Sequence, residues 1–236
     1  MGLNIKLGDP AQNSYVNATM ANEYFANRRN TTEWDNLATP DKVKVLAQAA
    51  RDMDRFNFIG NKYYDTQGLQ FPRDDHLVVT GNCGTPITKT SFRHSNLYST
   101  TYGVYPTSFW KYGSVHITSG TPVNDIRLIA SSNVTNGSIT VTEPFSATPT
   151  TNTEFIVFAP IDKEIRDAQC EQALYILQNS GMEDIYRYRY AGGQRVRMGD
   201  TDVTFDRFAT VKMPFSPVAR KLLSRWIRRS LRVGRA

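Results

Sequence analysis

Histidine and cysteine are the residue types in this sequence with the widest chemistry, because they bind metals and serve as bases or nucleophiles. The three histidines, His76, His94 and His116, show neither HxxxH nor HExxH spacing, so they predict no metal site. Cys83 and Cys170 lie far apart and outside any CxxC motif, which indicates neither a disulfide framework nor a thiolate zinc site. No base lies near Cys83 in the sequence, so we expect the thiols to be inert. We expect the histidines to lie at a surface or an interface.

Paired carboxylates could work as a general acid and base, and the sequence offers Asp52 with Asp54 and Asp74 with Asp75. On a helix, residues two apart point in different directions, and Asp74-Asp75 follows a proline in an expected loop. We therefore interpret these residues as caps and solvated charges. The sequence also lacks the motifs of a phosphate-binding loop, a nucleophile elbow or a dinucleotide site. It predicts a protein that is not an enzyme and needs no cofactor or metal.

The basic residues are concentrated at the end of the chain. Residues 219–236, ARKLLSRWIRRSLRVGRA, hold seven cations and no acid, and because the net charge of the chain is +6, the residues before Arg220 carry about −1. Ser216 followed by Pro217 predicts the start of a helix. Helical spacing places Val218, Leu222, Leu223, Trp226 and Ile227 on one side, and Lys221, Arg225, Arg228, Arg229 and Arg232 on the other. Such a basic amphipathic helix could dock on a protein or contact nucleic acid.

A second basic segment, YRYRYAGGQRVRMGDTDVTF, covers residues 186–205. Gly192-Gly193 separates two alternating runs and predicts a long hairpin or an extended loop. In a strand, the tyrosines of YRYRY share one face and its arginines share the other. This arrangement fits bases stacking on tyrosines, and it fits buried tyrosines beside solvated arginines equally well.

The remaining elements form three zones. Residues 14–73 have helical periodicity, with Asn17 as a plausible N-cap, a start signal at Thr39-Pro40-Asp41, and a buried stripe of Val43, Leu46, Ala47, Ala50 and Met53. Residues 77–158 are rich in Ser and Thr and carry alternating runs, with a turn signal at Asn136-Gly137, which predicts a β-domain. The many aromatic residues between Phe92 and Tyr112 argue against a disordered linker there. Residues 160–180 return to a helical pattern that stops at Gly181.

The helical zones resemble a known family. Three segments carry the resemblance: SYVNATMANEYFANRRNTTEWDNL, LAQAARDMDRFNFIGNKYYDTQGLQFPRDD and APIDKEIRDAQCEQALYIL. They are similar to the head-to-tail adaptor, or head-completion, family of tailed bacteriophages, a group that also carries the label DnaT-like single-stranded DNA-binding. The resemblance covers about residues 14–73 and 160–226. Residues 77–158 depart from it, because the family has only a short link there.

The resemblance implies a structural connector: a homo-oligomeric ring, commonly of twelve subunits, that docks beneath the portal protein, extends the DNA channel and presents a platform to the next neck or tail protein, a nozzle or stopper. Helices in a head-to-tail contact would close the ring. The protein would assemble in the host bacterial cytoplasm and reside in the virion, and packaged DNA would pass it without sequence specificity. The β-domain would touch neighbouring subunits, the portal or fibres. A single-stranded DNA-binding protein is the alternative.

Candidate sites follow from this interpretation. The C-terminal segment is expected to dock on the portal rather than on DNA, and removing the chain after Pro217 is expected to leave the fold intact. The loop is expected to line the channel or to contact the neighbouring subunit. The docking candidates are Arg220, Lys221, Arg225, Trp226, Arg228, Arg229, Arg232 and Arg235, and the loop candidates are Arg187, Arg189, Arg195 and Arg197.

The predicted fold class is α+β: a helical bundle core of an adaptor with a large all-β inserted domain and a C-terminal amphipathic basic helix. The expected domains are 1–76, the N-terminal part of the helical core; 77–158, the inserted β-domain; 159–215, the second part of the core with its Gly-rich loop; and 216–236, the basic docking helix and tail. We expect no membrane span, because no apolar run approaches about 18 residues.

Overall fold

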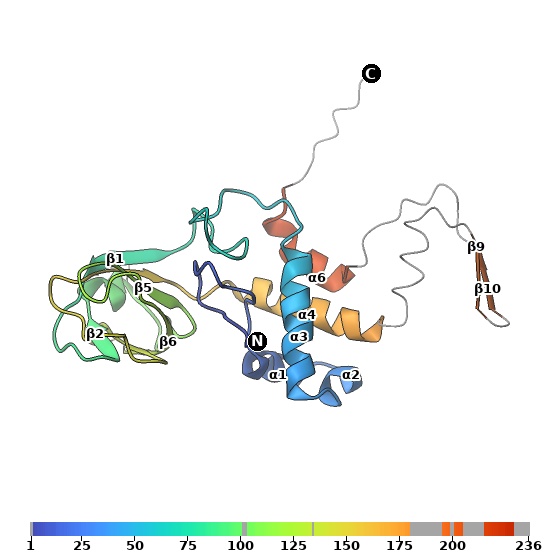
Figure 1. The fold of residues 1–236 in the computed structure, drawn as a ribbon, viewed down its shortest axis with the longest axis horizontal. Coiled ribbons are helices and arrows are strands. Elements are labelled where there is room, and N and C mark those ends of the chain that lie inside the picture. Colours follow the sequence, from blue (N-terminus) through green and yellow to red (C-terminus); the bar gives the residue numbers. More distant parts are fainter. Residues whose placement is uncertain are drawn as a thin grey trace, which may run out of the picture.

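The protein has an α+β fold, as predicted, with a group of helices beside a curled antiparallel sheet (Figure 1). The computed structural model describes residues 2–100, 103–133, 135–179, 195–198, 201–204 and 215–228. The helices are α1 (Ala18–Phe25), α2 (Thr32–Asp35), α3 (Thr39–Met53), α4 (Lys163–Gln178) and α6 (Pro217–Leu222), with 3-10 turns η1 (Ser95–Leu97) and η3 (Leu223–Arg225). None of these helices is both long and apolar enough to cross a bilayer.

The strands are β1 (Val78–Asn82), β2 (Ser91–Arg93), β3 (Ser99–Thr100), β4 (Gly103–Val104), β5 (Ser114–Ser119), β6 (Ile126–Asn133), β7 (Ser138–Val141), β8 (Glu154–Phe158), β9 (Arg195–Met198) and β10 (Thr201–Thr204). Six of them form one antiparallel sheet in the order β1-β8-β5-β6-β7-β2, and β3-β4 and β9-β10 form two separate pairs. The sheet curls until its edge strands meet at a bridge between Gly84 and Arg93.

The β6–β7 turn follows the sequence signal. Gly137 has φ +66°, and a Cβ there would lie 2.2 Å from the carbonyl oxygen of His94, so the position needs glycine. Phe92, Trp110 and Phe155 fill the core of the sheet. Leu128 instead faces the helices, where it packs against a cluster that contains Trp34 and Leu46. The domain boundaries at residues 76–77 and 158–159 stay predictions.

The helical zone begins as predicted and ends earlier. The Asn17 side chain accepts a hydrogen bond from the Met20 amide at 2.9 Å, which confirms the N-cap of α1. In α3 the cap position is Ala38, so Thr39 does not cap, and Ala49 takes the buried place expected for Ala47. The helical pattern stops at Met53, and the segment up to β1 is irregular.

Helix α4 is the centre of the helical part, and it buries polar side chains as well as apolar ones. Gln169 is fully buried. Its Oε1 accepts hydrogen bonds from the amides of Tyr15 at 2.8 Å and Val16 at 3.2 Å. Its Nε2 donates to Ser14 Oγ at 2.7 Å and to the Leu46 carbonyl at 2.8 Å. One side chain therefore joins α4, α3 and the segment before α1.

The C-terminal segment through Arg228 belongs to this helical part and is not a separate arm. Ser216 caps α6 as predicted, with its Oγ accepting from the Ala219 amide at 3.2 Å, and its own amide donates to Gln172 Oε1 at 2.9 Å. The Trp226 carbonyl accepts from the Ile59 amide at 2.7 Å. The expected long helix is wrong for the described residues, because α6 ends at Leu222 and a 3-10 turn follows.

The apolar side of this segment is also corrected. Ala219 and Leu223 are fully buried, whereas Val218, expected on that side, is 46% exposed. Leu222, Trp226 and Ile227 are partly buried against the core, in agreement with the predicted spacing. The tightening of the helix into a 3-10 turn changes the angle between successive side chains, so a constant helical spacing does not describe the whole segment.

Replacing Gln169 with alanine tests the hydrogen-bond network of α4. Gln169→Ala removes four buried hydrogen bonds and leaves the Tyr15 amide without its acceptor, so it should lower the free energy of unfolding by about 3 kcal/mol. Urea denaturation followed by circular dichroism measures the change. Gln178→Ala, an exposed position at the end of the same helix, is the matched control and should cost less than about 0.5 kcal/mol. Equal losses in the two variants would contradict this account.

Truncation tests whether the C-terminal segment is part of the fold. A chain that ends at Pro217 loses the buried Ala219 and Leu223, so it should be destabilised by at least about 3 kcal/mol. This expectation reverses the one drawn from the sequence. A control chain that ends at Arg228 keeps every described contact of the segment. The thermal midpoints of the two chains should differ clearly, and equal midpoints would show that the segment is dispensable.

Candidate nucleic-acid interface

His76 and His116 make contacts within the fold. The His116 ring is stacked on Tyr64 and its Nε2 lies 2.6 Å from the Leu7 carbonyl; burial lowers its pKa to about 4. The expected surface position is therefore wrong for His116, because the N-terminal segment covers it. His76 Nε2 lies 2.8 Å from the Ala159 carbonyl, and burial lowers its pKa. Burial also raises the pKa of the Cys83 thiol to about 12, so this thiol stays protonated near neutral pH.

The carboxylate pairs do not form an acid–base site, but Asp54 is not the solvated charge that the sequence indicated. Its Oδ1 accepts from the Tyr15 hydroxyl at 2.5 Å, and its Oδ2 accepts from the Gln70 amide at 3.0 Å. Burial raises the pKa of Asp54 to about 6, although both hydrogen bonds act in the opposite direction. Asp54 therefore ties the irregular segment after α3 to Tyr15.

The basic candidates of the sequence are only partly described. Arg187, Arg189, Arg229, Arg232 and Arg235 lie outside the described residues. Strand β9 contains Arg195 and Arg197, which pair with Thr204 and Asp202 of β10, so this part of the loop is a hairpin. The other docking candidates are in α6 and just after it: Arg220, Lys221, Arg225 and Arg228 are exposed, and Trp226 is half-buried.

Arg225 and Trp226 line a cavity of about 460 Å³, here called the tail groove. The link from β8 to α4, the first turns of α4 and the segment before β1 form its walls, and Phe109, in the turn between β4 and β5, closes one side. Four cationic side chains and two carboxylates line it. The lining residues are Phe71, Arg73, Asp75, His76, Leu77, Phe109, Ala159, Pro160, Ile161, Asp162, Lys163, Arg166, Arg225 and Trp226.

Arg73 builds the wall of the tail groove. Its side chain is 6% exposed, and its guanidinium donates to the carbonyls of Phe58 and Gly60 and to Gln70. Burial lowers its pKa. With these donors engaged inside the protein, Arg73 fixes the irregular segment. The other cations of the groove are Arg166, Arg225 and Lys163, and Lys163 Nζ lies 3.1 Å from Asp167 Oδ2.

Two aromatic rings are presented in the tail groove. The Arg225 guanidinium lies 4.3 Å from the ring centroid of Trp226, a cation–π contact. Phe109 is nearly parallel to Tyr105, with centroids 4.7 Å apart and an angle of 18°. Phe109 and Trp226 are both half-buried, so each is fixed by its neighbours and keeps part of its ring accessible.

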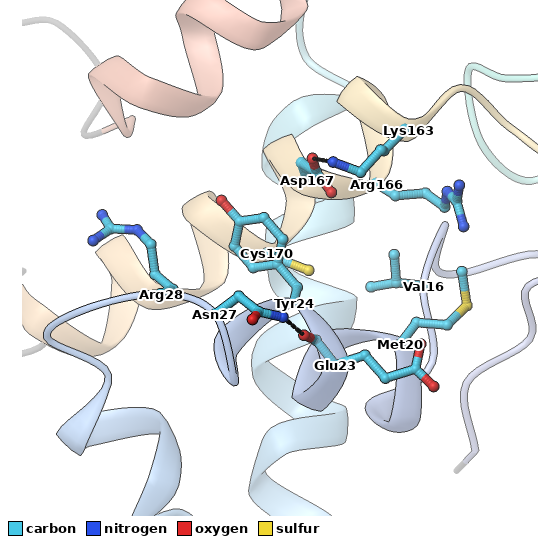
Figure 2. A pocket seen from close by; sticks show the side chains of 10 residues that line it. All are labelled: Val16, Met20, Glu23, Tyr24, Asn27, Arg28, Lys163, Arg166, Asp167 and Cys170. Atoms are coloured by element: carbon cyan, nitrogen blue, oxygen red, sulfur yellow. Dashed lines mark hydrogen bonds and ion pairs between the residues drawn. The ribbon is translucent and has the colours of Figure 1, made fainter.

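A second cavity, of about 350 Å³, lies between α1 and α4 and is called here the α1–α4 cavity (Figure 2). Lys163 and Arg166 line both this cavity and the tail groove. The α1–α4 cavity is lined by Val16, Met20, Glu23, Tyr24, Asn27, Arg28, Lys163, Arg166, Asp167 and Cys170.

Buried Glu171 fixes one end of the α1–α4 cavity. Arg28 donates to it from Nε at 2.6 Å and from Nη2 at 3.2 Å, and the Tyr24 hydroxyl donates at 2.6 Å. Burial alone would raise the pKa of Glu171, but these hydrogen bonds outweigh burial and lower it. Glu171 is therefore charged near neutral pH and holds α1 against α4.

Sequence reasoning named Arg225 and Trp226 but missed Lys163, Arg166 and Phe109. A signal for the first two was present. Cations are unfavourable in the first turn of a helix, where the backbone dipole is positive, so Lys163 and Arg166 at the start of α4 stand out, although Lys163 is paired with Asp167 four residues on. Phe109 carried no such signal, because only the fold brings it to the groove.

Comparison with known proteins tests the resemblance found in the sequence. Residues 6–87 match the model of a family described as "Putative DnaT-like ssDNA binding protein". This match spans α1, α2, α3 and β1, and it covers less than half of the chain. No curated protein matches the chain.

The family match overturns the head-to-tail adaptor interpretation. Of the two labels that the resemblance carried, the matching family bears the DnaT-like one and not the adaptor one. The interpretation as a portal-docked connector is therefore wrong. The predictions that depended on it are also wrong: the dodecameric ring, the portal and neck partners, the packaged DNA and the fibre contact. The resemblance was carried by three segments of the helical zones, and their residues do not specify what the protein binds.

Acidification tests the environment of Asp54. A carboxyl pKa raised to about 6 from its ordinary 3.8 means that the folded protein binds the proton more tightly than the unfolded chain. The resulting stability is complete below about pH 4 and is lost as the pH rises through 6. Compared with Asp54→Asn, the wild-type protein should gain about 2 to 3 kcal/mol between pH 7 and pH 4. Urea denaturation of both proteins at each pH measures this difference, and a constant difference would contradict the raised pKa.

Proposed function

We propose that this chain binds single-stranded DNA and that the tail groove contacts the strand. Single-strand binders combine cations that follow the backbone with aromatic side chains on which bases stack. The observation that carries the proposal is the position of half-buried Trp226, with Arg225 on its face, in the same cavity as Lys163 and Arg166. The match of residues 6–87 to a DnaT-like family supports the same function.

The cations of the tail groove have capacity left for phosphate. The Nε of Arg166 is buried without a hydrogen-bond partner among the described residues, so a phosphate would meet the rest of this half-buried guanidinium. Arg225 reaches Glu164 only at 3.9 Å, with both side chains largely exposed. Exposed pairs of this kind contribute little, so a phosphate can displace the carboxylate from Arg225.

The aromatic rings set the expected specificity. A base stacked on Trp226 or Phe109 gains about 1 to 3 kcal/mol, and every base has a face that can stack. Among the described residues of the groove, Asp75 and Asp162 oppose the cations, which favours moderate affinity that falls with salt. We therefore propose binding with little sequence preference. The cavity volume of about 460 Å³ lies in the usual range for small ligands and suits a single nucleotide.

In this proposal the protein acts by binding alone. The predicted absence of enzymatic activity and the predicted virion location stay predictions.

Intrinsic fluorescence tests the proposed function, because the other two tryptophans, Trp34 and Trp110, are 1% and 0% exposed. Titration with oligothymidylate should quench the Trp226 emission to a plateau, while the anisotropy of a labelled oligonucleotide rises with the same midpoint. With three phosphate contacts, the logarithm of the affinity should fall with the logarithm of salt at a slope of about −2. A duplex of equal length should bind more weakly.

Matched variants locate the site. Trp226→Phe should abolish the quenching but keep the rise in anisotropy, because phenylalanine still stacks. Arg225→Ala and Lys163→Ala should each weaken binding and reduce the salt slope by about 0.7. Arg29→Ala and Lys44→Ala remove exposed cations that do not line the groove and serve as controls. The proposal fails if wild-type protein does not bind the oligonucleotide, or if the control variants lose as much affinity as the groove variants.

A further inference from the structure

We infer that the α1–α4 cavity is a second nucleotide subsite for the same strand, with Lys163 and Arg166 holding the backbone between the two subsites. The inference rests on the proposed function and adds to it the path of the strand. One base would occupy the tail groove beside Trp226, and a neighbouring base would occupy the α1–α4 cavity beside Tyr24.

The shared cations carry the inference. Lys163 and Arg166 are three residues apart on α4, so their side chains are neighbours on one helix face. Both line the tail groove and the α1–α4 cavity. A strand that crosses the first turns of α4 would therefore meet the two cations with its phosphates, while the nucleotides on either side reach into different cavities.

The α1–α4 cavity has a chemistry that suits a base. Its floor contains the buried side chains of Val16, Met20 and Cys170. The half-buried ring of Tyr24 is fixed by the hydrogen bond of its hydroxyl to Glu171. A flat ring above an apolar floor can accept a base by stacking, and its volume of about 350 Å³ is in the range of small-ligand sites.

The two ends of the α1–α4 cavity differ. Figure 2 shows Arg166 near Val16 and Met20, with Arg28 on the far side of Tyr24. Arg28 is held by both oxygens of Glu171, so its charge is largely neutralised. Arg166 keeps an unpartnered buried Nε within the described part of the chain. Because Arg166 lines both cavities, we place the phosphate end of the subsite at Arg166 and the base toward Tyr24.

Exposed Glu23 and Asn27 allow the charge of the α1–α4 cavity to be changed without disturbing the core. Glu23→Gln removes a negative charge and should tighten binding of an eight-nucleotide oligothymidylate about threefold, whereas Asn27→Glu should weaken it about threefold. Glu33→Gln and Asn36→Glu make the same changes at exposed positions of α2 and just after it, and should leave the affinity unchanged.

Stacking on Tyr24 is tested separately. Tyr24→Leu should weaken binding about tenfold, and Tyr24→Phe, which keeps the ring and loses the hydroxyl, should restore most of the affinity. Trp226 quenching at saturation should be the same in all these variants, because the tail groove is unchanged. Tyr24→Leu should weaken the binding of a dinucleotide, which is long enough to occupy both subsites, and should leave the binding of a mononucleotide unchanged.

The outcomes separate the two ideas. If wild-type protein binds the eight-nucleotide probe and Trp226 is quenched, but the Glu23, Asn27 and Tyr24 variants behave like the α2 controls, the second subsite is rejected and the proposed function stands. If wild-type protein neither binds nor shows quenching, the proposed function fails and the subsite fails with it. Opposite shifts in Glu23→Gln and Asn27→Glu, with rescue by phenylalanine at position 24, support the subsite.

Discussion

The helical part of this protein depends on the burial of α4 on nearly all sides. Gln169 and Gln172 are fully buried and Glu171 is 4% exposed, and buried polar groups need partners. Each of the three finds them in a different part of the chain. Gln169 bonds to residues 14–16, Glu171 to Arg28 and Tyr24, and Gln172 to Ser216. The buried polar side chains of α4 need hydrogen-bond partners inside the protein, and these hydrogen bonds determine where the surrounding segments lie.

The tail groove and the α1–α4 cavity both result from this arrangement of segments around α4. Gln172 anchors the start of α6, and the backbone bonds of Trp226 and Arg228 to residues 57–59 fix its far end. The indole of Trp226 is thereby held beside the first turns of α4. Glu171 does the same for Tyr24 on the other side of the helix. Hydrogen bonds within the fold therefore hold the rings of Tyr24 and Trp226, which come from distant parts of the chain, around Lys163 and Arg166.

Local signals in the sequence predicted much of the fold, and long-range contacts account for what it missed. Asn17 and Ser216 cap helices as expected, and the alternating residues Val115 with Ile117 lie in a strand. These features depend on near neighbours. The buried position of Asp54 depends on Tyr15, and the position of Phe109 in the groove depends on the whole sheet, so neither could be predicted from spacing. The resemblance to adaptors failed because the segments that carried it do not identify a ligand.

The pairing of β1 with β8 has a consequence for how the sheet is attached. Val78 lies opposite Phe158 in the ladder, so the chain enters and leaves the sheet at adjacent points. The distance between the points where the chain enters and leaves the sheet is therefore the spacing of two paired strands, about 5 Å. A short turn could bridge the same gap. Such a turn would keep the path of the chain but would remove the contacts that the sheet makes with the helical part through Leu128 and through the bond of the Leu7 amide to Ser114 Oγ.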